Sequence, residues 1–245
     1  MKVSIITTTY NSEESIEGTL KSLLSQDYSD IEHILIDGAS QDDTMNIVDR
    51  FPHVSIKLSE KDNGVYEALN KGLHLATGDV IGFLHSDDVF HSDSVVSQIV
   101  DTIRSNPEWN GVYGDIHFVD GNGKTKRVYS AKNWSYLDFS RGIMPPHPSF
   151  FAYRKIYQNL RFDTRFRIAS DFDLLLKLFQ DPELSFGYSG IVTTDMSTGG
   201  ISTRNWRSNV IINREIMQIL KEQGIRSNYF KIYSKYVRRL LELRP

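Results

Sequence analysis

Short apolar runs alternate with segments of helical hydrophobic spacing along the first 105 residues. The apolar runs lie at 3–8, 31–36 and 80–84, the segment 54–58 alternates like a strand, and the helical patterns lie at 12–26, 44–51, 65–76 and 94–104. Apolar runs of this length predict buried strands, whereas apolar residues that recur every three or four positions predict amphipathic helices. This alternation predicts an α/β domain with a mostly parallel central sheet, covered by helices on both faces.

The pattern changes after Pro107. Two strand-like segments, 111–119 and 124–129, flank the sequence Asp-Gly-Asn-Gly at 120–123, which is typical of a hairpin turn. We therefore expect antiparallel strands, over 111–119 and 124–129, to join the sheet in this half. The pattern then predicts a helix over 170–180, short strands near 184–186 and 191–194, and, within 205–243, two helices separated by Gly224.

Composition excludes several classes of protein. The 245 residues include no cysteine, which excludes disulfide scaffolds, zinc–thiolate sites and cysteine nucleophiles. No apolar stretch approaches the ~18 residues of a membrane span, and the N-terminus lacks the apolar core of a signal peptide. We therefore expect a cytoplasmic protein.

Charge is unevenly distributed along the chain. Residues 201–245 contain ten Lys and Arg against three Asp and Glu, whereas the first 200 residues carry a net charge of −10 (18 against 28). The acidic body argues against a nucleic-acid partner, and the basic tail suits an anionic surface.

Polar residues follow each of the four predicted parallel strands. They are Thr8-Thr9-Tyr10-Asn11, Asp37-Gly38-Ala39-Ser40, Glu60-Lys61-Asp62-Asn63-Gly64 and His85-Ser86-Asp87-Asp88. The carboxyl ends of parallel strands meet at one edge of the sheet, where ligands bind. Three of these ends carry carboxylates, which repel one another unless a cation offsets their charge. Asp42 or Asp43, further along, is expected to cap the following helix.

Asp87 and Asp88 are the best candidates for a metal site at this edge. Oxygen ligands suit hard cations such as Mg²⁺ and Mn²⁺, which keep positions open for substrate phosphates. No glycine-rich phosphate loop follows the first strand, and no P-loop sequence occurs anywhere. A dinucleotide dehydrogenase and a P-loop NTPase are therefore both poor interpretations.

These strings together resemble glycosyltransferase family 2, whose members have the GT-A fold. The resemblance is dense over residues 3–11, 36–44, 59–72 and 76–88, and thinner over 145–205. It implies an inverting nucleotide-sugar transferase, similar to those of bacterial exopolysaccharide and O-antigen assembly. It also implies a catalytic domain over 1–204, with a nucleotide-binding half (1–105) and an acceptor-binding half (106–204), followed by a C-terminal helical extension over 205–245.

The resemblance assigns roles to particular residues. Asp171 would be the catalytic base, while its position also suits a helix cap; Asp173 is the second choice. Asp88 would bind the metal together with Asp87, although Ser86 and Ser170 stand where the family often has acidic residues. On the acceptor side the resemblance places His147 and Asp173; the residues expected around the donor are Thr9, Tyr10, Asn11, Asp37, Glu60, Asp62, Asn70, Lys71, Asp87 and Arg204.

The activity implied is transfer of one sugar from a nucleoside diphosphate donor to a hydroxyl of a glycan or lipid-linked saccharide, in polysaccharide biosynthesis. A UDP-sugar is the favoured donor, and Mn²⁺ or Mg²⁺ the expected cofactor. The sequence lacks the Gln-x-x-Arg-Trp motif of processive synthases, so we expect one sugar per encounter. The alternatives are a sugar-1-phosphate nucleotidyltransferase and an inactive nucleotide-sugar-binding homologue.

The last predicted helix is both basic and amphipathic. Its aromatic and aliphatic residues interleave with Lys231, Lys235, Arg238 and Arg239. Such a helix suits peripheral contact with the inner face of the cell membrane. It equally suits packing on the body of the protein with its charges in solvent.

Overall fold

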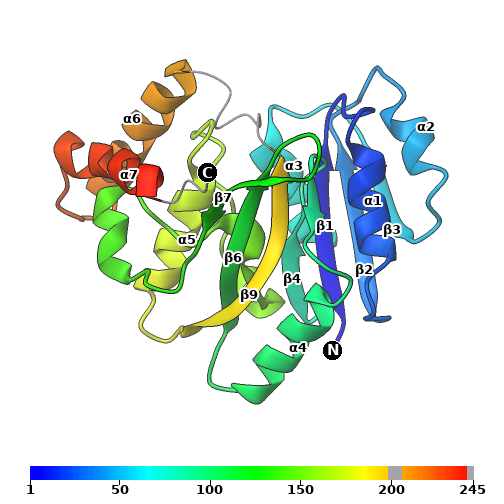
Figure 1. Cartoon of the computed structure of the whole chain (residues 1–245), viewed down its shortest axis with the longest axis horizontal. Helices are drawn as coiled ribbons and strands as arrows, with labels where there is room; N and C mark the ends of the chain where they lie inside the picture. Colours follow the sequence, from blue (N-terminus) through cyan, green and yellow to red (C-terminus); the bar gives the residue numbers. More distant parts are fainter. Residues whose placement is uncertain (198–205, 242–245) are drawn as a thin grey trace.

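The structure, a computed structural model, describes residues 1–197 and 206–241 (Figure 1). The strands are β1 (Val3–Thr9), β2 (Ile31–Asp37), β3 (Val54–Ser59), β4 (Val80–Phe83), β5 (Asp88–Phe90), β6 (Gly111–Val119), β7 (Thr125–Tyr129), β8 (Phe151–Tyr153) and β9 (Phe186–Ser197). The α-helices are α1 (Ile16–Leu24), α2 (Thr44–Val48), α3 (Val65–Leu75), α4 (Val95–Ser105), α5 (Ser170–Gln180), α6 (Trp206–Glu222) and α7 (Tyr229–Leu241). Short 3₁₀ helices are η1 (Tyr136–Arg141), η2 (His147–Ser149) and η3 (Arg154–Tyr157).

All nine of these strands form one sheet, in the order β3-β2-β1-β4-β8-β6-β9-β5, with β7 paired to β6. The pairings among β3, β2, β1 and β4 are parallel, as the alternation of strands and helices predicts. Beyond β4 the sheet is mixed: β8, β7 and β5 pair antiparallel, whereas β6 and β9 pair parallel. The prediction of a mostly parallel sheet therefore holds for the first half, and the predicted antiparallel strands are confirmed in the second.

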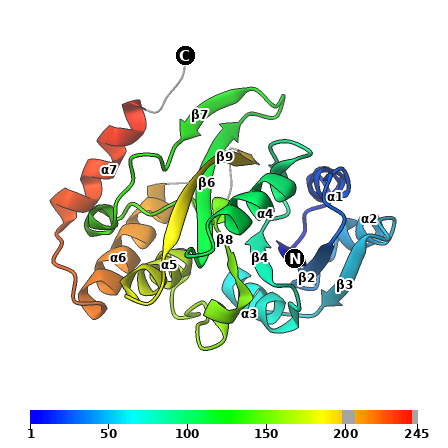
Figure 2. The same cartoon turned by 90° about the horizontal axis from the view of Figure 1, so that it is seen from below.

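Helices cover both faces of this sheet (Figure 2). Ile5 of β1 packs in one core with Val96 of α4, whereas its neighbour Ile6 packs in another core with Leu69 of α3 and Leu175 of α5. Because successive strand residues point to opposite faces, α4 lies on one face and α3 and α5 on the other. α3 approaches β1 closely at Gly72, where a Cβ would collide with Ile6.

The second half departs from the predicted elements in two ways. The strand expected near 191–194 is confirmed as part of the longer strand β9, whereas the separate short strand expected near 184–186 is wrong, because β9 begins only at Phe186. Gly190, at φ +73°, and a register shift beside Asp115 allow β9 to stay paired with β6 across this irregularity. Strands β5 and β8, three residues each, are too short to show a period in the sequence.

The C-terminal helices pack against the second half of the chain (Figure 1). Ile216, Ile219 and Leu220 of α6 and Ile232 of α7 are buried in the same core as α5. The break between them is close to the one predicted at Gly224, which has φ +72°. Among the described residues, no helix has both the length and the hydropathy needed to cross a bilayer.

Candidate active site

The turn after β4 positions the two adjacent carboxylates. The buried Thr19 hydroxyl, on α1, donates a hydrogen bond to the backbone oxygen of Asp88 (2.8 Å) and lies 3.4 Å from that of His85. The Asp88 amide in turn donates to the His85 oxygen (3.1 Å). Ser86 is held by the hydroxyl of Ser12 at 2.9 Å. These bonds fix the backbone of the turn, so that Asp87 and Asp88 are presented at the edge of the sheet.

Asp88 is a buried carboxylate without a hydrogen-bond partner among the described residues, and only 1% of its surface is exposed. Burial raises its pKa well above the usual range, the charge of Asp87 raises it further, and the nearby backbone of Ser197 offsets only part of the effect. Burying an unpaired carboxylate is costly unless a cation accompanies it. Asp87 is partly exposed. The pair therefore fits a divalent cation with open positions toward solvent.

Asp37 is fully buried at the end of β2, where protein donors satisfy its carboxylate. It accepts hydrogen bonds from the amide and hydroxyl of Ser40, at 3.0 and 2.5 Å, and from the hydroxyl of Ser59 at 2.6 Å. These bonds hold the tight turn in which Ala39 has φ +65°. In this structure Asp37 thus shapes the strand-end loop, and its predicted contact with a nucleotide remains a prediction.

The ends of β1, β2 and β3 lie together, as predicted. The Gly38 amide donates to the Thr9 oxygen (3.0 Å), and a Cβ on Gly38 would lie 3.1 Å from Asp62 Oδ2 and 3.3 Å from the Tyr10 ring. Tyr10 is 61% exposed, so an accessible aromatic face lies beside a carboxylate. Asn11, at φ +48°, accepts a hydrogen bond from the Gln41 amide and joins the first two loops.

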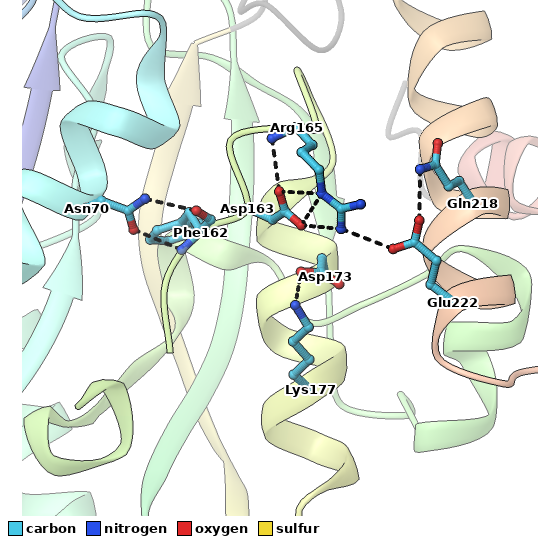
Figure 3. A network of polar contacts seen from close by, with 8 residues as sticks. All are labelled: Asn70, Phe162, Asp163, Arg165, Asp173, Lys177, Gln218 and Glu222. Carbon is cyan, nitrogen blue, oxygen red and sulfur yellow. Dashed lines mark hydrogen bonds and ion pairs between the residues drawn. The ribbon is translucent and has the colours of Figure 1, made fainter. Parts of the chain in front are cut away.

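Three other residues predicted to bind the donor gather beside β3. Glu60, Asn70 and Lys71 line a shallow hollow together with Arg161. Lys71 is paired with Glu60 at 2.9 Å. Both polar atoms of Asn70 bind the backbone of Phe162, at 2.9 Å each (Figure 3). Asn70 therefore holds the segment before α5 against α3, a structural contact that the sequence did not indicate.

Asp171 lies in the first turn of α5. Its Oδ1 accepts hydrogen bonds from the Phe172 amide (2.8 Å) and from the hydroxyl of Tyr66 (3.3 Å), which also donates to the Ile168 oxygen at 2.6 Å. The pKa of Asp171 is raised to about 6, chiefly because the carboxyl is buried. The two hydrogen bonds oppose this increase in pKa, and the negative charge of Glu215 adds to it. Asp171 as a whole residue is half-buried. A carboxyl with a pKa near neutrality suits a general base.

Glu215 of α6 supports the segment that carries Asp171, a role that sequence reasoning missed. Its carboxylate accepts the amides of Arg167, Ile168 and Ala169 at 2.8, 2.9 and 3.0 Å. The N-cap residue of α5 is Ala169 and no side chain caps it, so the cap expected at Asp171 is not formed; Glu215 instead binds the amides just before the helix. No local pattern could indicate this, because the partners lie 46–48 residues apart.

A second link joins α6 to the same segment (Figure 3). Arg165 binds Asp163 at 2.6 Å and Glu222 of α6 at 3.2 Å. Asp173, predicted on the acceptor side, is buried and bound to Lys177 at 2.6 Å. Burial raises the pKa of Asp173, and the bond and charge of Lys177 oppose this shift. Because Asp173 is already paired, it is a weaker candidate than Asp171 for the base.

A cluster of rings connects Asp171 with the turn that carries Asp87. Tyr66, the partner of Asp171, stacks on Phe162 (5.7 Å between centroids), and Phe162 contacts the ring of His147 at 5.6 Å. His147 lies 6.3 Å from His85. A continuous series of ring contacts thus links Asp171, the expected base, to the turn that carries Asp87, an expected metal ligand.

His147, predicted on the acceptor side, is buried and stacks on Phe83 at 4.6 Å. Burial, together with the nearby His85, lowers its pKa to about 3, so the ring is neutral at pH 7. Its Nε2 has no hydrogen-bond partner in the part of the chain that the structure describes. Arg204, predicted to bind the diphosphate, lies outside the described residues.

A family model described as "Glycosyl transferase family 2" matches residues 4–179, which include every strand end described above and Asp171. The chain belongs to glycosyl transferase family 2. The resemblance drawn from the sequence is confirmed, and the protein is a glycosyltransferase.

Relatives and solved structures agree with this assignment. The "PGL/p-HBAD biosynthesis glycosyltransferase" of Mycobacterium bovis is 29% identical over 223 residues, covering 89% of this chain and 83% of its own. A glycosyltransferase of Haemophilus influenzae is 28% identical over 95% of this chain and 94% of its own. The structure of S. aureus TarS superimposes on this glycosyltransferase with a TM-score of 0.65 at 19% sequence identity. The match covers 90% of this chain and 65% of the TarS chain. These neighbours establish the GT-A type of fold.

Proposed function

We propose that this glycosyltransferase moves one sugar from a nucleoside diphosphate donor, with a UDP-sugar favoured, to a hydroxyl of a glycan or lipid-linked saccharide in polysaccharide biosynthesis. The transfer inverts the anomeric carbon. Two observations support the proposal: Asp88 is a buried carboxylate without a hydrogen-bond partner among the described residues, and burial raises the pKa of the Asp171 carboxyl to about 6.

The printed names of the structural neighbours support this donor class. Structures of S. aureus TarS include complexes with UDP and with UDP-GlcNAc, and a Pyrobaculum calidifontis mannosyltransferase (TM-score 0.66, 19% identity, 91% of this chain and 64% of that one) is described with GDP-Man and Mn²⁺. We assign the nucleotide to residues 1–105, where Tyr10 and Asp62 offer a ring and a carboxylate. We assign the acceptor to residues 106–204, with 205–245 as a supporting extension.

In the proposed mechanism, Asp171 removes the proton from the acceptor hydroxyl as its oxygen attacks the anomeric carbon. The bond from that carbon to the diphosphate breaks on the opposite face, and the nucleoside diphosphate leaves. General-base assistance of this kind is typically worth ~10²–10⁴-fold in rate. A divalent cation, Mn²⁺ or Mg²⁺, held by Asp88 and Asp87 would offset the negative charge that develops on the leaving group.

A donor panel tests the proposal. The purified chain would be incubated with UDP- and GDP-sugars, with Mn²⁺ or with a chelator, and thermal shift and nucleotide release would be measured. We expect one nucleotide sugar to stabilise the chain and be turned over in a metal-dependent way. NMR of the glycoside product would then show the inverted anomer. A retained anomer, or turnover that the chelator leaves unchanged, contradicts the proposed mechanism.

Replacing Glu215 with Gln tests how α6 supports the base. Gln has one acceptor oxygen for the three amides that Glu215 binds, so Asp171 loses its exact position and kcat should fall by up to about 10²-fold. Because the charge of Glu215 contributes to the raised pKa of Asp171, the acid limb of the kcat/KM profile should also move to lower pH.

Glu222→Gln is the matched control, since Glu222 lies on the same helix and binds Arg165 rather than these amides. We expect a smaller change in kcat and no shift of the acid limb in this variant. A Glu215→Gln enzyme that loses only thermal stability, with an unmoved pH profile, would show that Glu215 is purely structural.

Helix α7 has one side buried against the body of the protein and another exposed to solvent. Ile232 and Lys235 of α7 are buried against the body, whereas Tyr229, Phe230 and Tyr233 are 52%, 87% and 48% exposed. We propose that this exposed aromatic face contacts the inner face of the cell membrane where a lipid-linked acceptor lies.

Phe230→Ser tests this contact, because it removes the most exposed of the large apolar side chains described. We expect a clear loss of co-sedimentation with anionic phospholipid vesicles, with Tm unchanged because the ring is in solvent. Leu137→Ser, a similarly exposed site on η1 (76%), serves as the control. Equal co-sedimentation of the wild type and the Phe230 variant would exclude α7 as a membrane contact.

A further inference from the structure

Two histidines and a carboxylate from three different segments lie together beside the second half of the sheet. His91 follows β5, His117 lies on β6 and Asp195 on β9. One potential ligand atom from each lies within 4.8 Å of the other two. His91 Nδ1 is 2.8 Å and His117 Nδ1 3.6 Å from Asp195 Oδ1, and the two imidazole rings meet edge to face with 4.8 Å between their centroids.

Strand register explains why these side chains meet. His117 and Asp195 are direct partners in the β6–β9 pairing, and Val89 is the partner of Asp195 in the β5–β9 pairing. His91 follows Val89 by two positions, and its amide donates to the Thr193 oxygen at 2.9 Å, so its side chain lies on the same face as Asp195. Asp88 pairs with Met196 instead and therefore points to the opposite face. The cluster therefore lies on the opposite face of the sheet from the Asp88 side chain.

We propose that His91, His117 and Asp195 bind a Zn²⁺ ion that ties β9 to β5 and β6. Imidazole nitrogens favour zinc over the hard cations that an all-oxygen site prefers. In a tetrahedral site with bonds of ~2.0–2.1 Å, neighbouring ligand atoms lie about 3.3 Å apart. The separations of 2.8 and 3.6 Å from Asp195 are close to that value. Closing the remaining gap requires rotation of His91, which at 38% exposure has room to move.

The proposed zinc site lies next to the strand pairing that positions Asp88. Asp195 directly precedes Met196, the strand partner of Asp88, on β9. An ion held by three segments fixes β9 where it passes the proposed donor site. Zinc therefore stabilises the pairing of β5 with β9, which includes the backbone of Asp88, without binding the Asp88 side chain.

Zinc binding is measured on the full chain after treatment with a chelator, without nucleotide and in excess Mg²⁺ so that hard-cation sites are filled. We expect isothermal titration to show one Zn²⁺ per chain and the ion to raise Tm. His91→Ala and Asp195→Asn should each weaken binding by at least about 10- to 100-fold, since even residues behind the ligands contribute that much. Co²⁺ added to the wild type should give visible absorption bands, which His91→Ala should lose.

Two controls locate the ion. His74→Ala removes an exposed histidine on α3, and Asp88→Asn alters the proposed donor site; both should bind zinc as the wild type does. The proposal is wrong if the wild type does not bind zinc, if His91→Ala binds it unchanged, or if Asp88→Asn is the variant that loses it. Because His91 is partly exposed, its variant is expected to fold, and a metal-free Tm close to that of the wild type verifies this. None of these readouts depends on the proposed transfer reaction.

Discussion

Asp171→Asn is expected to lower kcat by about 10²- to 10⁴-fold while the Kd for the nucleotide donor stays within a factor of two or so. Asn keeps the size of the side chain and can still accept the hydrogen bonds from Phe172 and Tyr66, but it cannot take a proton at neutral pH. Turnover would be followed by nucleotide release in the presence of acceptor, and donor binding by calorimetry.

Asp173→Asn is the informative comparison, because Asp173 is the other carboxylate of the same helical turn. It is paired with Lys177, so its loss should affect stability more than turnover. If Asp173→Asn abolished transfer while Asp171→Asn remained active, the roles assigned to the two residues would be reversed.

The pH profile of the wild type gives an independent check of the same assignment. With the pKa of Asp171 at about 6, the base is mostly protonated at pH 5 and mostly ionised at pH 7. kcat/KM should therefore rise with pH through about 6 and then level off. The linked stability has the opposite sign: a carboxyl whose folded pKa is raised favours folding at low pH, and this contribution is lost as pH rises from the unfolded value near 3.9 to about 6.

The first half of the fold follows from local patterns. The segments 3–8, 31–36, 54–58 and 80–84 are each within a residue or two of β1, β2, β3 and β4. β1, β2 and β4 have apolar residues at successive positions because they are buried on both faces, whereas the edge strand β3 alternates because every second residue is exposed. The hairpin is similarly local, since Asp120 accepts the Gly123 amide (2.9 Å) where Gly123 has φ +75°. Of the two caps considered for α2, Asp42 makes the bond, to the Thr44 amide at 3.1 Å.

The features that sequence reasoning missed depend on tertiary contacts. β5 exists because β9 passes beside Asp88, and nothing in Asp88-Val89-Phe90 itself predicts pairing. In the sequence, Glu215 is one charged residue of a predicted helix, and nothing near it indicates a partner. Only folding brings its carboxylate to the amides before α5. Likewise, the sequence places Asp37 among candidate ligands, while the structure shows donors from β3 and the Ser40 turn occupying its oxygens.

Asp88→Asn is expected to separate metal binding from folding, because Asp88 is a buried carboxylate for which the described part of the chain supplies no hydrogen-bond partner. Without metal, the variant should be more stable than the wild type, since the pKa of the buried acid is raised well above its usual range and the wild type must either carry a buried charge or hold a proton. The sign follows from linkage: a raised folded pKa stabilises at low pH, and that stability is lost as pH rises above the unfolded value near 3.9. The difference in Tm between the variant and the wild type should therefore grow between about pH 4 and pH 7.

With Mn²⁺ and nucleotide the order of stability should reverse. At a ligand concentration of 100 Kd, binding stabilises a folded chain by about 2.7 kcal/mol, which corresponds to roughly 5–10 °C in Tm for a chain of this size. We expect this increase in the wild type and in Asp101→Asn, which removes an exposed carboxylate on α4, and its loss in Asp88→Asn. An Asp88→Asn variant that keeps the full metal-dependent shift would show that the cation is held elsewhere. The unpartnered carboxylate at this sheet edge would then need another explanation.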